Sequence, residues 1–110
     1  MTVEESFESV ASRLAAADGT VEEGKIFNSY GLKTGGRFFA FARRGELVVK
    51  LPAERVSALT GTGEGEPFES GGRVMREWVT LRPTDEDACG AYVAEAHSFA
   101  AANADGRRRS

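Results

Sequence analysis

Three side chains in the middle of the chain have the types that bind anions. Lys50 lies in the apolar run from Glu46 to Leu51, and Arg76 and Trp78 share one face of a later run, Val74 to Leu81. A basic side chain in mid-strand is costly unless its face meets solvent or an anion. If the two strands are neighbours, the three side chains form a basic patch with an aromatic floor, suited to an acidic peptide or a small anion. The alternative is a solvated sheet face on which the stem of Lys50 packs against Trp78.

The other reactive side chains are not spaced for catalysis or metal binding. Cys89 and His97 are the only cysteine and histidine in the chain, and both lie on one predicted helix. Eight residues of helix separate them by about 12 Å along its axis. This distance is too long for both side chains to bind one metal ion or to form a Cys–His nucleophile pair. We therefore predict a buried Cys89, a His97 at the surface or rim, no catalytic residues, no metal, no cofactor and no enzymatic activity.

Two glycine-rich stretches lack the features of phosphate-binding loops. Gly35-Gly36 and the stretch from Gly61 to Gly72 have neither the glycine spacing nor the following helix that such loops require. Acidic residues within the second stretch would also repel phosphate. We predict a turn at the first stretch and a long loop at the second, anchored to the core by Phe68.

The charge balance disfavours nucleic acid as a partner. The 110 residues carry a net charge of −3, and without Arg107–Arg109 the 14 basic residues fall to 11 against 17 acidic ones, a net charge of −6. A body of that sign repels a phosphate backbone, so we expect no direct nucleic-acid binding. Residues 104–110 are predicted to be a flexible basic tail, either solubilising or in contact with an acidic partner.

The chain shows no signal for a membrane or for secretion. No apolar run approaches the roughly 20 residues of a membrane-spanning helix. The acidic start, MTVEESFESV, lacks the basic segment and apolar core of a secretory signal. We therefore predict a cytoplasmic protein that does not bind membranes.

The apolar periodicity predicts helices at the two ends and strands between them. An i, i+3, i+4 stripe begins at Val3 and predicts an amphipathic helix that ends at Asp18-Gly19. The later expectations, in chain order, are a strand at 21–28, a turn at 28–31 followed by a short extended piece, strands at 37–43 and 46–51, a short helix after Pro52, a strand at 74–81, and a long helix capped by Thr84.

Alternation within the strands predicts which residues share a face. Phe39 and Phe41 fall on one face of their strand, and Phe38 falls on the other with two alanines, so this strand should be central and covered on both sides. Met75 is predicted to share a face with Val79 and Leu81.

The order of elements indicates an α+β fold with two layers. A central antiparallel sheet carries the N- and C-terminal helices, all within one domain, residues 1–103. An open sheet edge would permit a homodimer.

Several short segments resemble the TfoX/Sxy N-terminal domain family. The resemblance covers roughly Val3 to Ala102 and is carried by these segments: Ile26-Phe27, Gly31-Leu32-Lys33, Phe38-Phe39-Ala40, the run from Leu47 to Pro52, Glu66-Pro67-Phe68, and Met75 to Val79. It implies a two-layer α+β domain related to MmcQ/YjbR-like and secretion-chaperone-like folds. It also implies a short stand-alone member, as found in actinobacteria, without the helical C-terminal domain.

The resemblance brings no catalytic residues, and the proteins that name the family are transcriptional co-activators. We therefore expect a regulatory or adaptor domain that acts through protein–protein contacts linked to transcription. The alternative is a domain that binds a small molecule or anion on the sheet face near Lys50, Arg76 and Trp78.

Overall fold

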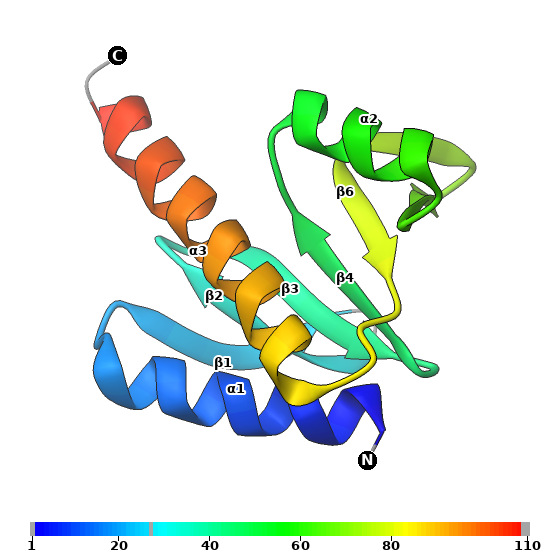
Figure 1. Cartoon of the computed structure of the whole chain (residues 1–110). Helices are drawn as coiled ribbons and strands as arrows, with labels where there is room; N and C mark the ends of the chain where they lie inside the picture. The colour runs from blue at the N-terminus through cyan, green and yellow to red at the C-terminus, as the bar shows by residue number, and fades with distance from the viewer. Residues whose placement is uncertain (1, 27, 109–110) are drawn as a thin grey trace.

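The fold is α+β, as the order of predicted elements indicates. The computed structural model describes residues 2–26 and 28–108, with side chains up to residue 102. The elements in chain order are α1 (Val3–Ala17), β1 (Val21–Ile26), β2 (Ser29–Thr34), β3 (Arg37–Arg43), β4 (Glu46–Lys50), α2 (Ala53–Thr62), β5 (Gly65–Ser70), β6 (Arg73–Leu81) and α3 (Glu86–Arg108) (Figure 1).

The six strands form one open antiparallel sheet in the order β1-β2-β3-β4-β6-β5. All three helices contribute to the same core, so they cover one face of the sheet, which we call the inner face (Figure 1). A second, smaller cluster of apolar side chains lies on the opposite, outer face, where none of the described helices packs. The buried apolar side chains therefore form two clusters, a larger one between the helices and the inner face and a smaller one on the outer face.

The first helix forms as the apolar stripe predicts. Phe7 and Val10 are buried in the inner core, and Val3 and Leu14 pack against it. The Thr2 hydroxyl accepts a hydrogen bond from the N–H of Glu5, whose carboxylate accepts one from the N–H of Thr2. This reciprocal cap satisfies two backbone donors that a helix start leaves without partners.

The predicted face of Phe39 is wrong because β3 contains a β-bulge. Leu32 of β2 pairs with Ala40, but the next residue, Lys33, pairs with Phe38, so Phe39 is an extra residue in the ladder. The bulge turns Phe39 to the inner core together with Ala40, while Phe41 joins the outer cluster. The strand is nevertheless central and buried on both faces, as predicted.

The stretch from Gly61 to Gly72 is not the predicted long loop but holds the end of α2, strand β5 and the turn into β6. Gly61 belongs to α2, Gly63 follows the helix with a φ of 84°, and β5 begins at Gly65. Gly71 and Gly72 have φ values of 61° and 80° and join β5 to β6 in a two-residue turn. Such turns need positive φ at both central residues, which glycine adopts without strain. Phe68 is buried as expected, but in the outer cluster.

The turn predicted at 28–31 is wrong for its last three residues, which belong to β2. Ile26 pairs with Ser29, and Asn28 before Ser29 has a φ of 59°, whereas residue 27 lies outside the described residues. Gly24 and Gly31 pair directly, and atoms of the Phe38 ring lie 3.2 Å from the position of a Cβ at either glycine. The Phe38 ring covers the backbone of the two glycines, which have no side chains to shield it from solvent. Such cover by an aromatic ring stabilises glycine in strands.

The last helix is capped by a different residue from the one predicted. Its first turn is capped by Asp85, whose Oδ1 accepts from the N–H of Ala88 at 2.8 Å, rather than by Thr84. The helix continues through Arg108. The side chains of Arg107–Arg109, with which the tail hypothesis is concerned, lie outside the described part. Within that part, no helix combines the length and the apolar character needed to cross a membrane.

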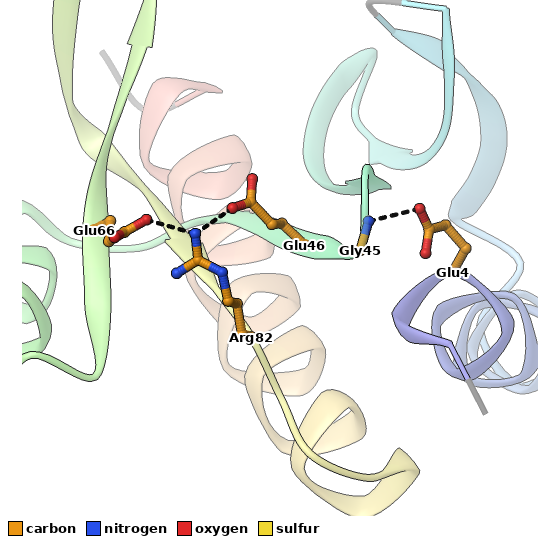
Figure 2. A network of polar contacts seen from close by, with 5 residues as sticks. All are labelled: Glu4, Gly45, Glu46, Glu66 and Arg82. Carbon is orange, nitrogen blue, oxygen red and sulfur yellow. Dashed lines mark hydrogen bonds and ion pairs between the residues drawn. The ribbon is translucent and has the colours of Figure 1, made fainter.

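Charged side chains connect the strands at the end of β6. Arg82 donates from Nη2 to carboxylate oxygens of Glu46 on β4 and Glu66 on β5, the latter at 2.8 Å (Figure 2). The hydrogen bond that Arg82 donates to Glu66 is the main reason that the pKa of Arg82 is raised. Nearby, Glu4 accepts from the N–H of Gly45 in the β3–β4 turn at 2.8 Å (Figure 2). These contacts are exposed and contribute little stability individually, but they hold three strands together at this end.

Candidate functional site

The three side chains singled out in the sequence line one hollow in the structure. Lys50 and Trp78 are direct partners in the β4–β6 ladder, and Arg76 lies two residues before Trp78. The hollow has a volume of about 530 Å³. Its lining residues come from the end of β4, the start of α2 and the first two-thirds of β6, and they are Lys50, Ala53, Arg73, Val74, Met75, Arg76, Glu77 and Trp78.

The hollow exists because β6 is longer than β4. The paired part of β4 ends at Lys50, and one further bond runs from the N–H of Leu51 to the C=O of Glu77 at 2.9 Å. Pro52 then directs the chain into α2, since its fixed φ suits a helix start and it has no N–H to continue a ladder. The β6 segment before Glu77 therefore extends past the end of β4, and Ala53 forms the opposite wall.

An aromatic cluster on the outer face holds the floor of the hollow. The ring of Trp78 lies with its centroid 5.8 Å from that of Phe41 and 6.2 Å from that of Phe68, and the two phenylalanines are 5.7 Å apart in an edge-to-face arrangement. Pairs with these separations attract through their ring quadrupoles in addition to burying area. Trp78 is thus half-buried and held in place, with part of its surface left open to the hollow.

The rim of the hollow is positively charged, in contrast to the chain as a whole. Three of the lining side chains are cations, Lys50, Arg73 and Arg76, and one is a carboxylate, Glu77. The Lys50 Nζ is 4.0 Å from a carboxylate oxygen of Glu77, whereas neither arginine has an ion-pair partner among the described residues. A local excess of positive charge on a protein of net charge −3 attracts acidic groups to this position.

The hollow also carries the largest exposed apolar side chains of the described part. Val74 is 57% exposed and Met75 is 37% exposed. The prediction that Met75 shares a face with Val79 is wrong because the register is irregular: Pro67 pairs with Val79, but the next residue, Phe68, pairs with Met75. The extra β6 residues between these pairs bend the strand, so its first part leaves the core.

Sequence reasoning identified Lys50, Arg76 and Trp78 but missed Arg73, Val74 and Met75. The available signal was Gly71-Gly72, a dipeptide that favours a tight hairpin turn and thus a strand on each side. In such a hairpin, Val74 and Met75 lie near the turn, where there is no core to bury them.

Cys89 and His97 do not form a reactive pair in the structure. Cys89 is completely buried, and burial is the first cause that raises the pKa of its thiol to about 11. His97 lies at the rim, with its Nε2 3.3 Å from Oδ2 of Asp18 and its ring beside Phe39. The described residues contain no group of three or more histidine, cysteine or acidic side chains placed to hold a metal ion.

The state of Cys89 leads to a direct chemical prediction. A thiol with a raised pKa and no exposed surface forms little thiolate and admits no reagent. We expect native protein at neutral pH to resist labelling by a maleimide, and unfolded protein in guanidinium chloride to take up one equivalent, as measured by intact mass. Stoichiometric labelling of the native protein at the rate of a free thiol would contradict the buried position.

Comparisons of the chain with protein-family models, with curated proteins and with solved structures found no match.

Proposed function

We propose that this protein is a non-enzymatic adaptor domain that binds an acidic segment of another protein at the hollow around Trp78. One observation carries the proposal: two exposed apolar side chains, Val74 and Met75, adjoin three cations on a fixed aromatic floor. Exposed apolar groups with tryptophan and arginine beside them are the usual composition of protein-binding surfaces. The resemblance to the TfoX/Sxy domain supports a partner that belongs to the transcription apparatus.

The charge distribution favours a protein over a nucleic acid as the partner. Three cations and a single carboxylate line the hollow, while the chain as a whole carries a net charge of −3. A long polyanion is repelled by the net negative charge of the rest of the chain, whereas a short acidic segment needs to contact only the hollow.

Charge reversal at the hollow tests this proposal. Lys50→Glu combined with Arg76→Glu is expected to weaken capture of the partner by about a hundredfold, since two charge-assisted contacts become repulsive. The matched control is Lys25→Glu with Arg37→Glu, which changes the net charge equally at exposed positions outside the hollow. The measurement is an affinity pull-down with tagged full-length protein, quantified by mass spectrometry for transcription components.

The two possible failures of this experiment have different meanings. If both double variants capture the same proteins as the wild type, the hollow is not the binding surface. If both lose them equally, the attraction is due to net charge and the specific site is wrong.

A second candidate function is the binding of a small anionic molecule in the same hollow. Its volume of about 530 Å³ lies within the roughly 300–1,000 Å³ typical of small-ligand sites. A thermal-shift screen of carboxylates and phosphate esters decides between the candidates. A rise in melting temperature that disappears in Lys50→Glu/Arg76→Glu favours the small ligand, and no shift together with a specific protein partner favours the adaptor.

A further inference from the structure

The projecting part of β6 has an edge that no described strand pairs with. On one side, Arg73–Met75 pairs with Phe68–Ser70 of β5. On the other side, the ladder with β4 stops at Lys50 and Trp78, and the last bond reaches only Glu77. The hollow lies against this open edge, with Ala53 as its far wall.

The hairpin geometry shows which backbone groups face the open edge. In the two-residue turn at Gly71-Gly72, the flanking residues Ser70 and Arg73 form the pair that exchanges hydrogen bonds. Backbone polar groups of successive strand residues point to opposite edges, so the N–H and C=O of Val74 point away from β5 and toward the open edge. An unpaired donor and acceptor side by side is the template on which an added strand forms.

The charges around this edge disfavour a second copy of the chain as the added strand. A second copy at this edge would add its own Arg73 and Arg76 to the two arginines already there, and like charges gathered on one short edge repel each other. An acidic strand would instead place carboxylates opposite Arg73 and Arg76, which have no ion-pair partner in the described part of the chain.

We propose that an extended acidic segment of a partner protein adds to the sheet as a strand along the open edge of β6 at Arg73–Arg76. This proposal rests on the proposed function and specifies how the partner is held. Backbone hydrogen bonds between the segment and Val74 provide the attachment. The acidic side chains of the segment pair with Arg73 and Arg76, and its alternating apolar side chains contact Trp78.

A peptide titration tests strand addition without altering the protein. The probe is a short capped peptide in which acidic and apolar residues alternate, and the readout is the fluorescence of Trp78, the only tryptophan. In an added strand, only every second N–H faces β6. N-methylation of one alternate set of residues should therefore weaken binding by about tenfold or more, and methylation of the other set should leave it nearly unchanged.

A pair of proline variants tests the same contact from the side of the protein. Val74→Pro removes the donor at the open edge and no bond to β5, so it is expected to weaken peptide binding by about tenfold. Glu69→Pro is the matched control, because Glu69 is the partner of Val74 across the hairpin and its N–H faces the outer edge of β5, away from the hollow. If Val74→Pro does not fold by circular dichroism, the methylated peptides decide the question with wild-type protein.

Each outcome has a distinct meaning. Binding that depends on which alternate set is methylated, and that Val74→Pro weakens while Glu69→Pro does not, supports strand addition. Strand addition is overturned if Lys50→Glu/Arg76→Glu abolishes peptide binding while neither methylation of the peptide nor Val74→Pro changes it. In that case the proposed function still stands. Absence of binding by the wild type overturns both, and a dimer seen by light scattering that Val74→Pro dissociates would assign the edge to a second copy instead.

Discussion

Replacement of Phe41 by alanine is expected to lower the free energy of unfolding by about 3–5 kcal/mol, the range for a fully buried phenylalanine. Phe41 has no exposed surface although it lies on the outer face, where no described helix covers it. Its ring packs edge-to-face on Phe68 and beside Trp78, so the substitution leaves a cavity at the centre of the outer cluster. The measurement is urea unfolding followed by circular dichroism, with Trp78 fluorescence as a second probe.

Phe38→Ala is the control for Phe41→Ala on the same strand. Phe38 is half-buried and covers the Gly24–Gly31 pair at the side of the outer cluster, so its removal should cost less. In addition, Phe41→Ala should release Trp78 and shift its emission to longer wavelength, whereas Phe38→Ala should not. Equal costs for the two variants, or a cost below about 1 kcal/mol for Phe41→Ala, would show that the outer cluster is not a second core.

Substitution of Gly65 by alanine is expected to destabilise the protein by about 1–3 kcal/mol, as overpacking of a filled site does. Gly65 is buried opposite Leu81, and a Cβ at this position would lie 2.6 Å from Cγ2 of Val79 and 3.2 Å from Cδ2 of Leu81. Since contacts below 3.0 Å are not tolerated, β5 must move away from β6 or the Val79 side chain must shift. Thermal and urea unfolding measure the loss.

Two further variants separate overpacking from a general effect of glycine replacement. Gly61→Ala places a methyl group on α2 with no other atom within 4 Å, so it should stabilise the protein by up to about 1 kcal/mol through helix propensity. Val79→Ala removes the clashing methyl group, so Gly65→Ala should cost less in that background than in the wild type. A purely additive pair would contradict the clash as the cause.

The two clusters have different consequences for binding. The inner core joins the helices to the sheet and includes side chains from every helix. The outer cluster holds Trp78 in place on the face where the hollow opens. A rigid aromatic floor reduces the ordering cost that a partner must overcome, because the side chain is already in one position before binding.

Features that depend on a local pattern of residues were predicted correctly, and features set by long-range pairing were not. The helix with the stripe from Val3 to Leu14 and the neighbouring strands at 37–43 and 46–51 were predicted because their determinants lie within a few residues. Phe39 and Met75 were placed on the wrong face because each adjoins a register irregularity between strands, and such irregularities are set by the packing of the partner strand.

The candidate site was predictable only in part for the same reason. Residue types alone singled out Lys50, Arg76 and Trp78 as candidate partners of an anion, subject to the condition that their strands are neighbours. The β4–β6 pairing meets that condition, and it joins segments that are far apart along the chain.

The sequence by itself determined the α+β class, the central strand with two buried faces and the buried position of Cys89. The reason is that the period of the apolar residues specifies both the type of each local element and which of its faces is buried. Only the tertiary structure decided that β6 extends past β4, that its first part leaves the core, and that cations and exposed apolar side chains meet around Trp78. These features arise from unequal strand lengths and from bulges in long-range pairing, which no local pattern of residues encodes.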